Sequence, residues 1–121
     1  MIKQLILVGL GGGVGSMMRF LVSKIPFAQG SFPWATFAVN IVGSFLIGIL
    51  IGLSVRHQIL NADMKLLLVT GFCGGFTTFS AFSAENVHLY QSGNYFSLAF
   101  YILLSIVAGF AAVLSGLILG K

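Results

Sequence analysis

Four long apolar segments, separated by short polar connections, account for nearly the whole chain. Three of them carry no charged side chain: residues 35–55, 66–84 and 94–120. The remaining one, residues 5–22, carries only Arg19. A helix needs roughly 20 apolar residues to cross about 30 Å of hydrocarbon. The pattern therefore predicts a single domain of four transmembrane helices, over residues 1–24, 34–56, 64–90 and 95–120.

Composition strengthens this prediction and narrows the function classes. Of the 121 residues, 58% are hydrophobic and 7% are charged, whereas soluble domains carry about 25% charged residues. We therefore expect an all-α integral membrane protein whose apolar side chains face the lipid bilayer. The net charge is +4, but the six basic residues are scattered at the helix ends and form no patch that would bind nucleic acid. We expect them to anchor the helices at the membrane interfaces. They are Lys3, Arg19, Lys24, Arg56, Lys65 and Lys121.

The first apolar segment also has features of a secretory signal, because it follows Lys3. No A-x-A-like cleavage site comes after it, which favours a retained helix. With four spans, one membrane side would carry four of the basic residues and the other would carry Arg19 and Lys24. This weak bias permits insertion in both orientations.

Glycines recur at the spacing that lets membrane helices approach closely. Sixteen glycines include four small-xxx-small pairs: Gly11 and Gly15, Gly48 and Gly52, Gly71 and Gly75, and Gly116 and Gly120. Helices packed this tightly leave little room for a central cavity in one subunit. We therefore expect a transport path to need more than one subunit.

The third segment contains the strongest candidate site, Gly71–Glu85 (GFCGGFTTFSAFSAE). Its glycines, followed by the β-branched Thr77 and Thr78, weaken a helix and predict a break in mid-membrane. Broken membrane helices occur where they line a cavity, and their freed carbonyls can coordinate a cation. Close packing of the glycines alone is the alternative interpretation.

Polar residues form stripes on the predicted helices. In the second helix Thr36, Asn40 and Ser44 recur every four residues on one face. A buried amide such as Asn40 must be hydrogen-bonded, which leaves a helix–helix bond and a pore-lining donor as alternatives. Tyr101 and Ser105 repeat the pattern more weakly in the fourth helix.

After the predicted break, hydroxyl and aromatic residues alternate in a way that suits an anion. Thr77 and Ser80 lie beside a line formed by Phe79 and Phe82, and an aromatic edge carries partial positive charge. Arg19 either snorkels to the interface or attracts an anion into a vestibule. No carboxylate lies in mid-membrane and no catalytic or metal-binding set of side chains is recognisable, so an enzyme is not expected.

These residues resemble the Fluc (CrcB-like) family of fluoride channels. The run GFCGGFTTFSAFSAE is similar to its third-helix signature, and GGGVGSMMR and TFAVNIVGSFLIG are similar to its first two helices. The resemblance implies an antiparallel, dual-topology homodimer with two fluoride pores, which exports fluoride passively across a bacterial inner membrane.

The resemblance also implies roles for individual residues. A central Na⁺ would be held by backbone carbonyls of Gly74 and Thr77 in each subunit. Arg19 and Glu85 would lie at the vestibule. The pore would be lined by Asn40, Phe79, Phe82, Thr36, Ser80, Tyr101 and, more weakly, Ser105.

Two other classes remain as alternatives. A small four-helix multidrug/proton antiporter has a similar length, but it requires a carboxylate in its first helix, and none is present. A non-transporting assembly subunit would explain the glycines but not the grouping of Asn40 with the third-helix motif.

Overall fold

The protein is described here by a computed structural model covering residues 1–26 and 30–121. This part of the chain is helical and contains no strand. The elements are α1 (Ile2–Ser23), α2 (Trp34–Arg56), α3 (Ala62–Lys65), the π-helical η2 (Leu66–Cys73), α4 (Gly74–Phe76), α5 (Phe79–Gln91) and α6 (Tyr95–Gly120). Four stretches are long and apolar enough to cross a membrane: Ile2–Ser23, Trp34–Arg56, Ala62–Gln91 and Tyr95–Gly120. The all-helical, four-span expectation is confirmed.

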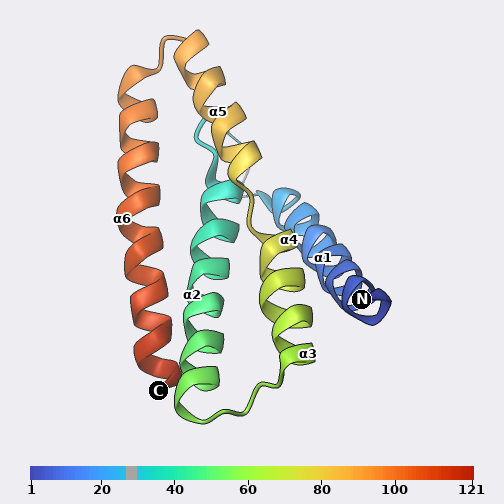
Figure 1. The fold of residues 1–121 in the computed structure, drawn as a ribbon. Coiled ribbons are helices and arrows are strands. Elements are labelled where there is room, and N and C mark those ends of the chain that lie inside the picture. The colour runs from blue at the N-terminus through green and yellow to red at the C-terminus, as the bar shows by residue number, and fades with distance from the viewer. Residues whose placement is uncertain (27–29) are drawn as a thin grey trace.

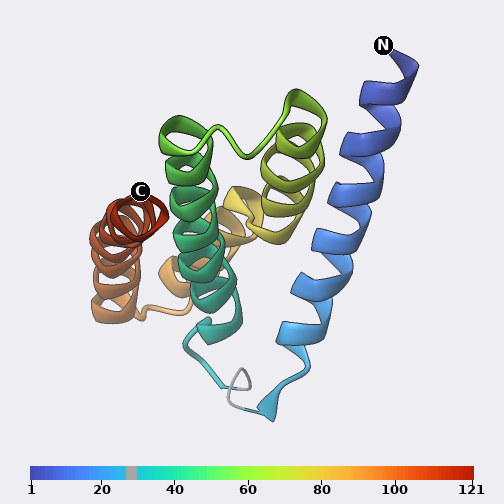
Figure 2. The same cartoon turned by 90° about the horizontal axis from the view of Figure 1, so that it is seen from below.

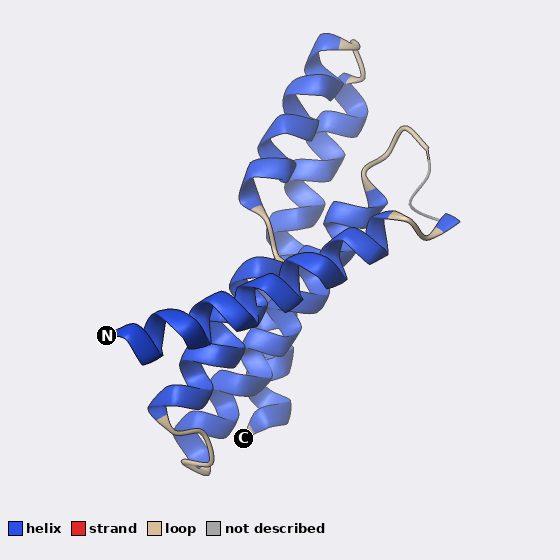
Figure 3. Ribbon diagram, turned by 90° about the vertical axis from the view of Figure 1, so that its right-hand side faces the viewer, coloured by secondary structure: helices blue, strands red, loops and turns tan. Residues whose placement is uncertain are grey.

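Glycines decide which helices touch. Helices α2 and α6 lie side by side along most of their length (Figure 1). A Cβ atom on Gly48 would overlap the Val113 carbonyl, and one on Gly116 would overlap the Phe45 carbonyl. Helix α1 crosses obliquely over the η2–α4 segment (Figures 2 and 3). Backbone-to-backbone contact of this kind is what small residues provide between membrane helices.

The chain between α4 and α5 is extended at two residues. Thr77 has φ −86° and ψ 158°, and Thr78 has φ −152° and ψ 121°. Thr78 then caps α5, because its hydroxyl accepts from the Ala81 amide at 3.2 Å. Gly74 and Gly75, at which we expected the helix to break, are themselves helical. The extended residues therefore follow the glycines instead of including them.

Close packing explains why the glycine pair stays helical. A Cβ on Gly75 would overlap the backbone of Gly12 in α1, so α1 lies directly against this turn. Glycine weakens a helix mainly through the freedom it retains when unfolded. Contact with α1 offsets that cost. The helix ends at the extended residues, whose backbone is hydrogen-bonded to the Asn40 side chain of α2.

Candidate anion path

The Asn40 side chain pairs with the backbone of the extended segment. Its Nδ2 donates to the Thr78 carbonyl at 3.1 Å, and its Oδ1 accepts from the Thr78 amide at 2.8 Å. In an uninterrupted helix the Thr78 amide would donate to the Gly74 carbonyl. Asn40 therefore takes the place of a helical hydrogen bond and stabilises the extended conformation. An amide nitrogen has two hydrogens, so Asn40 keeps a second donor.

Two further contacts hold the end of α4. The Thr77 hydroxyl donates to the Cys73 carbonyl at 2.8 Å. The Gly75 carbonyl accepts from Arg19 Nε at 3.1 Å and from the Ser16 hydroxyl at 3.5 Å. Arg19 thus points towards the end of α4 and does not simply extend along the helix surface. The last carbonyls of a helix carry partial negative charge, which makes them suitable partners for a guanidinium.

A groove of about 410 Å³ opens between α2, α5 and α6. Four of the residues predicted for the pore line it together: Asn40, Phe79, Phe82 and Ser105. Its other lining residues are Ser44, Thr77, Thr78, Gly109 and five apolar residues, Ile41, Ile47, Ile106, Phe110 and Val113. The groove therefore combines amide and hydroxyl donors with phenyl and aliphatic walls.

The Ser105 hydroxyl lies in this groove wall without a partner. Its Oγ is buried and makes no hydrogen bond to any described residue. A buried hydroxyl that stays unpaired costs free energy. Ser105 lines the groove, and its role in a pore stays a prediction.

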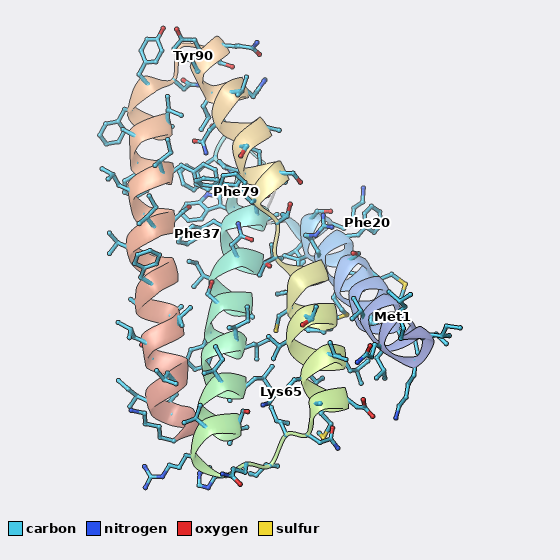
Figure 4. All side chains as sticks on the ribbon, viewed as in Figure 1. Met1, Phe20, Phe37, Lys65, Phe79 and Tyr90 are labelled. Carbon is cyan, nitrogen blue, oxygen red and sulfur yellow. The ribbon has the colours of Figure 1, made fainter. Side chains whose placement is uncertain are left out.

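Phe79 and Phe82 form an aromatic part of the groove wall. The rings of Phe79 and Phe82 are 5.9 Å apart between centroids, and Phe82 is 4.9 Å from the ring of Tyr101. Phe79, labelled at the start of α5 in Figure 4, is 78% exposed. A ring this exposed in a membrane-spanning helix faces lipid or another molecule.

Three predicted residues form a separate cluster around a carboxylate. The Thr36 hydroxyl donates to Glu85 Oε2 at 2.7 Å, and the Tyr101 hydroxyl donates to Glu85 Oε1 at 2.9 Å. Both oxygens are therefore occupied. Tyr101 is fully buried and Thr36 nearly so, and none of the three residues lines the groove.

A second cavity, of about 230 Å³, lies beside this cluster. It is lined by Arg19 and Thr36, with Phe20, Ser23, Ala35, Val39, Thr78 and Ala81. Thr78 lines both cavities, so the extended segment separates the Arg19 cavity from the groove. Ser80 lines neither of them: it is exposed, and its hydroxyl lies 3.2 Å from the Thr78 hydroxyl.

The predicted cation ligands are the backbone carbonyls of Gly74 and Thr77, and no side chain is among them. No group of three metal-binding side chains occurs among the residues that the structure describes. Because the Thr78 amide donates to Asn40, the Gly74 carbonyl is released from its helical partner. Gly74 is also exposed on the surface of the chain. Such a carbonyl at a helix end fits a cation that prefers oxygen ligands.

Sequence reasoning missed two residues of this site. Thr78 was considered only as a helix-weakening residue, although a threonine directly before a helical run is a common N-cap. Gly43 lies outside the four-residue stripe of the second helix, so the sequence pattern does not indicate it. A Cβ there would overlap the Thr77 methyl group, so the extended segment needs a glycine opposite it. No pattern within α2 shows that requirement.

Together these features define a multi-pass α-helical membrane protein with a groove beside the extended residues Thr77 and Thr78. The chain belongs to the CrcB family: the family model described as CrcB-like protein, Camphor Resistance (CrcB), matches residues 6–117. The resemblance inferred from the third-helix motif is thereby confirmed.

Curated relatives agree over nearly the full length. A protein from Azobacteroides pseudotrichonymphae is 54% identical over 98% of this chain and 97% of its own length. Proteins from Agrobacterium fabrum and Phocaeicola vulgatus are 51% and 49% identical, each over 95% of this chain and over 94% and 96% of their own lengths. All three are named fluoride-specific ion channel FluC.

Proposed function

We propose that this protein is a fluoride-selective channel that lets fluoride leave the cell passively, down its electrochemical gradient. The observation that carries the proposal is the groove in which Asn40, Ser105 and the Phe79–Phe82 pair face one space. Family membership and the names of the relatives support the same conclusion.

The chemistry of the groove suits a small, strongly hydrated anion. A dehydrating path must replace water with other donors, and the second hydrogen of Asn40 and the hydroxyl of Ser105 are available. Phenyl edges add weak positive potential without a formal charge. An anion held by such groups is stabilised but not trapped, which conduction requires.

We further propose that two antiparallel copies complete the path and create two pores. Phe79, which lines the groove, and Gly74, in α4, are both exposed in the single subunit. A second copy would cover them. The weak asymmetry of basic residues supports insertion in both orientations, and a bacterial inner membrane is the expected location.

The proposed sodium ion would bind where the two copies meet. The carbonyls of Gly74 and Thr77 from each copy would hold it, and its positive charge would offset the partial negative charge at the ends of the α4 helices. Asn40 prepares this site by withdrawing the Thr78 amide from Gly74. The antiporter alternative remains disfavoured because α1 has no carboxylate.

The decisive experiment is anion efflux from liposomes containing the purified protein. We expect rapid fluoride efflux and far slower chloride efflux, each measured with an ion-selective electrode after the potassium gradient is shunted with an ionophore. Equal rates for the two anions, or no efflux of either, would refute the proposed function. Crosslinking of purified protein in the same liposomes tests the dimer separately.

A further inference from the structure

A third hollow lies at the opposite end of the bundle from Arg19. It has a volume of about 230 Å³ and is formed between the end of α2 and the start of η2. Its polar lining consists of Lys65, Ser54 and Thr70, and its walls are Ile51, Val55 and Val69. Figure 4 shows Lys65 near the end of the bundle at which α2 ends, well below Phe20, the neighbour of Arg19.

All three polar groups of this hollow are free to bind something else. The Ser54 and Thr70 hydroxyls and the Lys65 ammonium make no hydrogen bond or ion pair with any described residue. The nearest acid in the sequence, Asp63, is already paired with Lys3 at 2.7 Å. One cation and two hydroxyl donors facing one space form a site for an anion.

The hollow is aligned with the groove along a single face of α2. At about 100° per residue, Thr36, Ser44 and Ser54 all fall within roughly 40° of Asn40 around the helix. Thr36 lines the Arg19 cavity, Asn40 and Ser44 line the groove, and Ser54 lines the third hollow. The three hollows therefore follow one another along this face, with a basic residue at each end.

The length of this series matches a membrane. The rise from Thr36 to Ser54 is about 27 Å at about 1.5 Å per residue, close to the roughly 30 Å of a hydrocarbon core. Basic residues at the two ends of a narrow path raise the local concentration of anions there. Arg19 occupies one end and Lys65 the other.

We propose that Lys65, with Ser54 and Thr70, forms a second mouth of the anion path, where fluoride is collected at the membrane face opposite Arg19. This inference rests on the proposed channel function, and it commits to a small inorganic anion. The phosphate of an anionic lipid is the other ligand with matching chemistry, and the experiment separates the two.

The test measures fluoride efflux for Lys65→Gln and for a matched control, Lys121→Gln, which removes the same charge at the same end of the bundle. In zwitterionic vesicles at low ionic strength we expect Lys65→Gln to conduct about fivefold more slowly than wild type, the factor for a unit charge at contact distance in a water-filled mouth. The control should match wild type. The difference should shrink in an impermeant electrolyte that screens the charge.

A chemical rescue distinguishes the loss of the positive charge at residue 65 from misfolding of the variant. Lys65→Cys is treated, after reconstitution, with a thiol reagent that adds an ammonium group or with one that adds a sulfonate. We expect the ammonium to restore efflux and the sulfonate to depress it further, while wild type, whose Cys73 is buried, is unaffected by either reagent.

Failure of this inference differs from failure of the channel function. If wild type conducts fluoride and Lys65→Gln behaves like Lys121→Gln, the second mouth is refuted and the channel stands. An effect of Lys65 that exists only in vesicles with anionic lipid assigns the hollow to a lipid phosphate and also refutes the proposal. No fluoride efflux from wild type refutes the channel itself.

Discussion

Replacing Asn40 with alanine should collapse the extended segment and abolish conduction. The substitution removes two hydrogen bonds, at 2.8 and 3.1 Å, to the Thr78 backbone. Each is worth about 1 kcal/mol net, and each backbone group left buried without a partner costs about 1–3 kcal/mol. The extended conformation should therefore lose roughly 2–4 kcal/mol relative to its alternatives.

The favoured alternative is a continuous helix. Without Asn40, the Thr78 amide regains a partner by donating to the Gly74 carbonyl, as in an ordinary helix. That change would move Thr77 and Phe79 out of the groove and remove the carbonyl proposed for the cation. We expect fluoride efflux to fall at least tenfold, because 1.4 kcal/mol already changes an equilibrium by that factor.

Two controls separate the backbone role of Asn40 from its role as a donor to the ion. Asn40→Asp keeps an oxygen for the Thr78 amide, so amide hydrogen exchange at Thr78 should stay slow although a carboxylate in the groove stops fluoride efflux. Asn94→Ala removes an amide whose side chain makes no capping hydrogen bond and should conduct normally. Efflux of Asn40→Ala within twofold of wild type, with unchanged exchange at Thr78, would refute this reasoning.

Three further predictions concern the groove, the cation site and the packing. Phe82→Ile should cut fluoride efflux severalfold while the crosslinked dimer persists; unchanged efflux would remove Phe82 from the path. Gly74→Val should disrupt dimer assembly or activity although its Cβ has ample space inside one subunit, with Val69 O the nearest atom at 3.9 Å; a fully active variant would contradict a Gly74 site between copies. Gly116→Ala should destabilise the protein by about 1–3 kcal/mol, because its Cβ overlaps the α2 backbone. Gly13→Ala, with nothing within 4 Å, is the control, and equal thermal stability of the two would count against the packing argument.

Much of the architecture could be predicted from the sequence alone. Length of apolar runs and scarcity of charge are sufficient to predict four membrane helices, because the hydrocarbon core imposes both requirements on any chain that crosses it. The glycine pairs of α2 and α6 likewise mark a close helix contact, since only a missing side chain allows such approach. Candidate residues such as Asn40 and Phe82 stood out because amides and paired rings are costly or unusual in membrane spans.

The sequence does not predict which polar groups on different helices form hydrogen bonds with one another. The glycine pair at Gly74 predicts weakness in the third helix, but Asn40 in α2 decides that the extended residues are Thr77 and Thr78. Likewise, Glu85 near a helix end gives no sign that Thr36 and Tyr101 occupy both of its oxygens.

The physical reason is that periodicity records which face a residue occupies on its own helix, whereas a hydrogen bond depends on which helix faces it and at what height. Apolar runs, glycine spacing and polar stripes are therefore enough to predict four closely packed membrane helices whose polar residues are concentrated on few faces. Which of those faces meet depends on how the helices pack in three dimensions. That packing brings Asn40, Phe79, Phe82 and Ser105 to one groove and leaves Ser80 outside it.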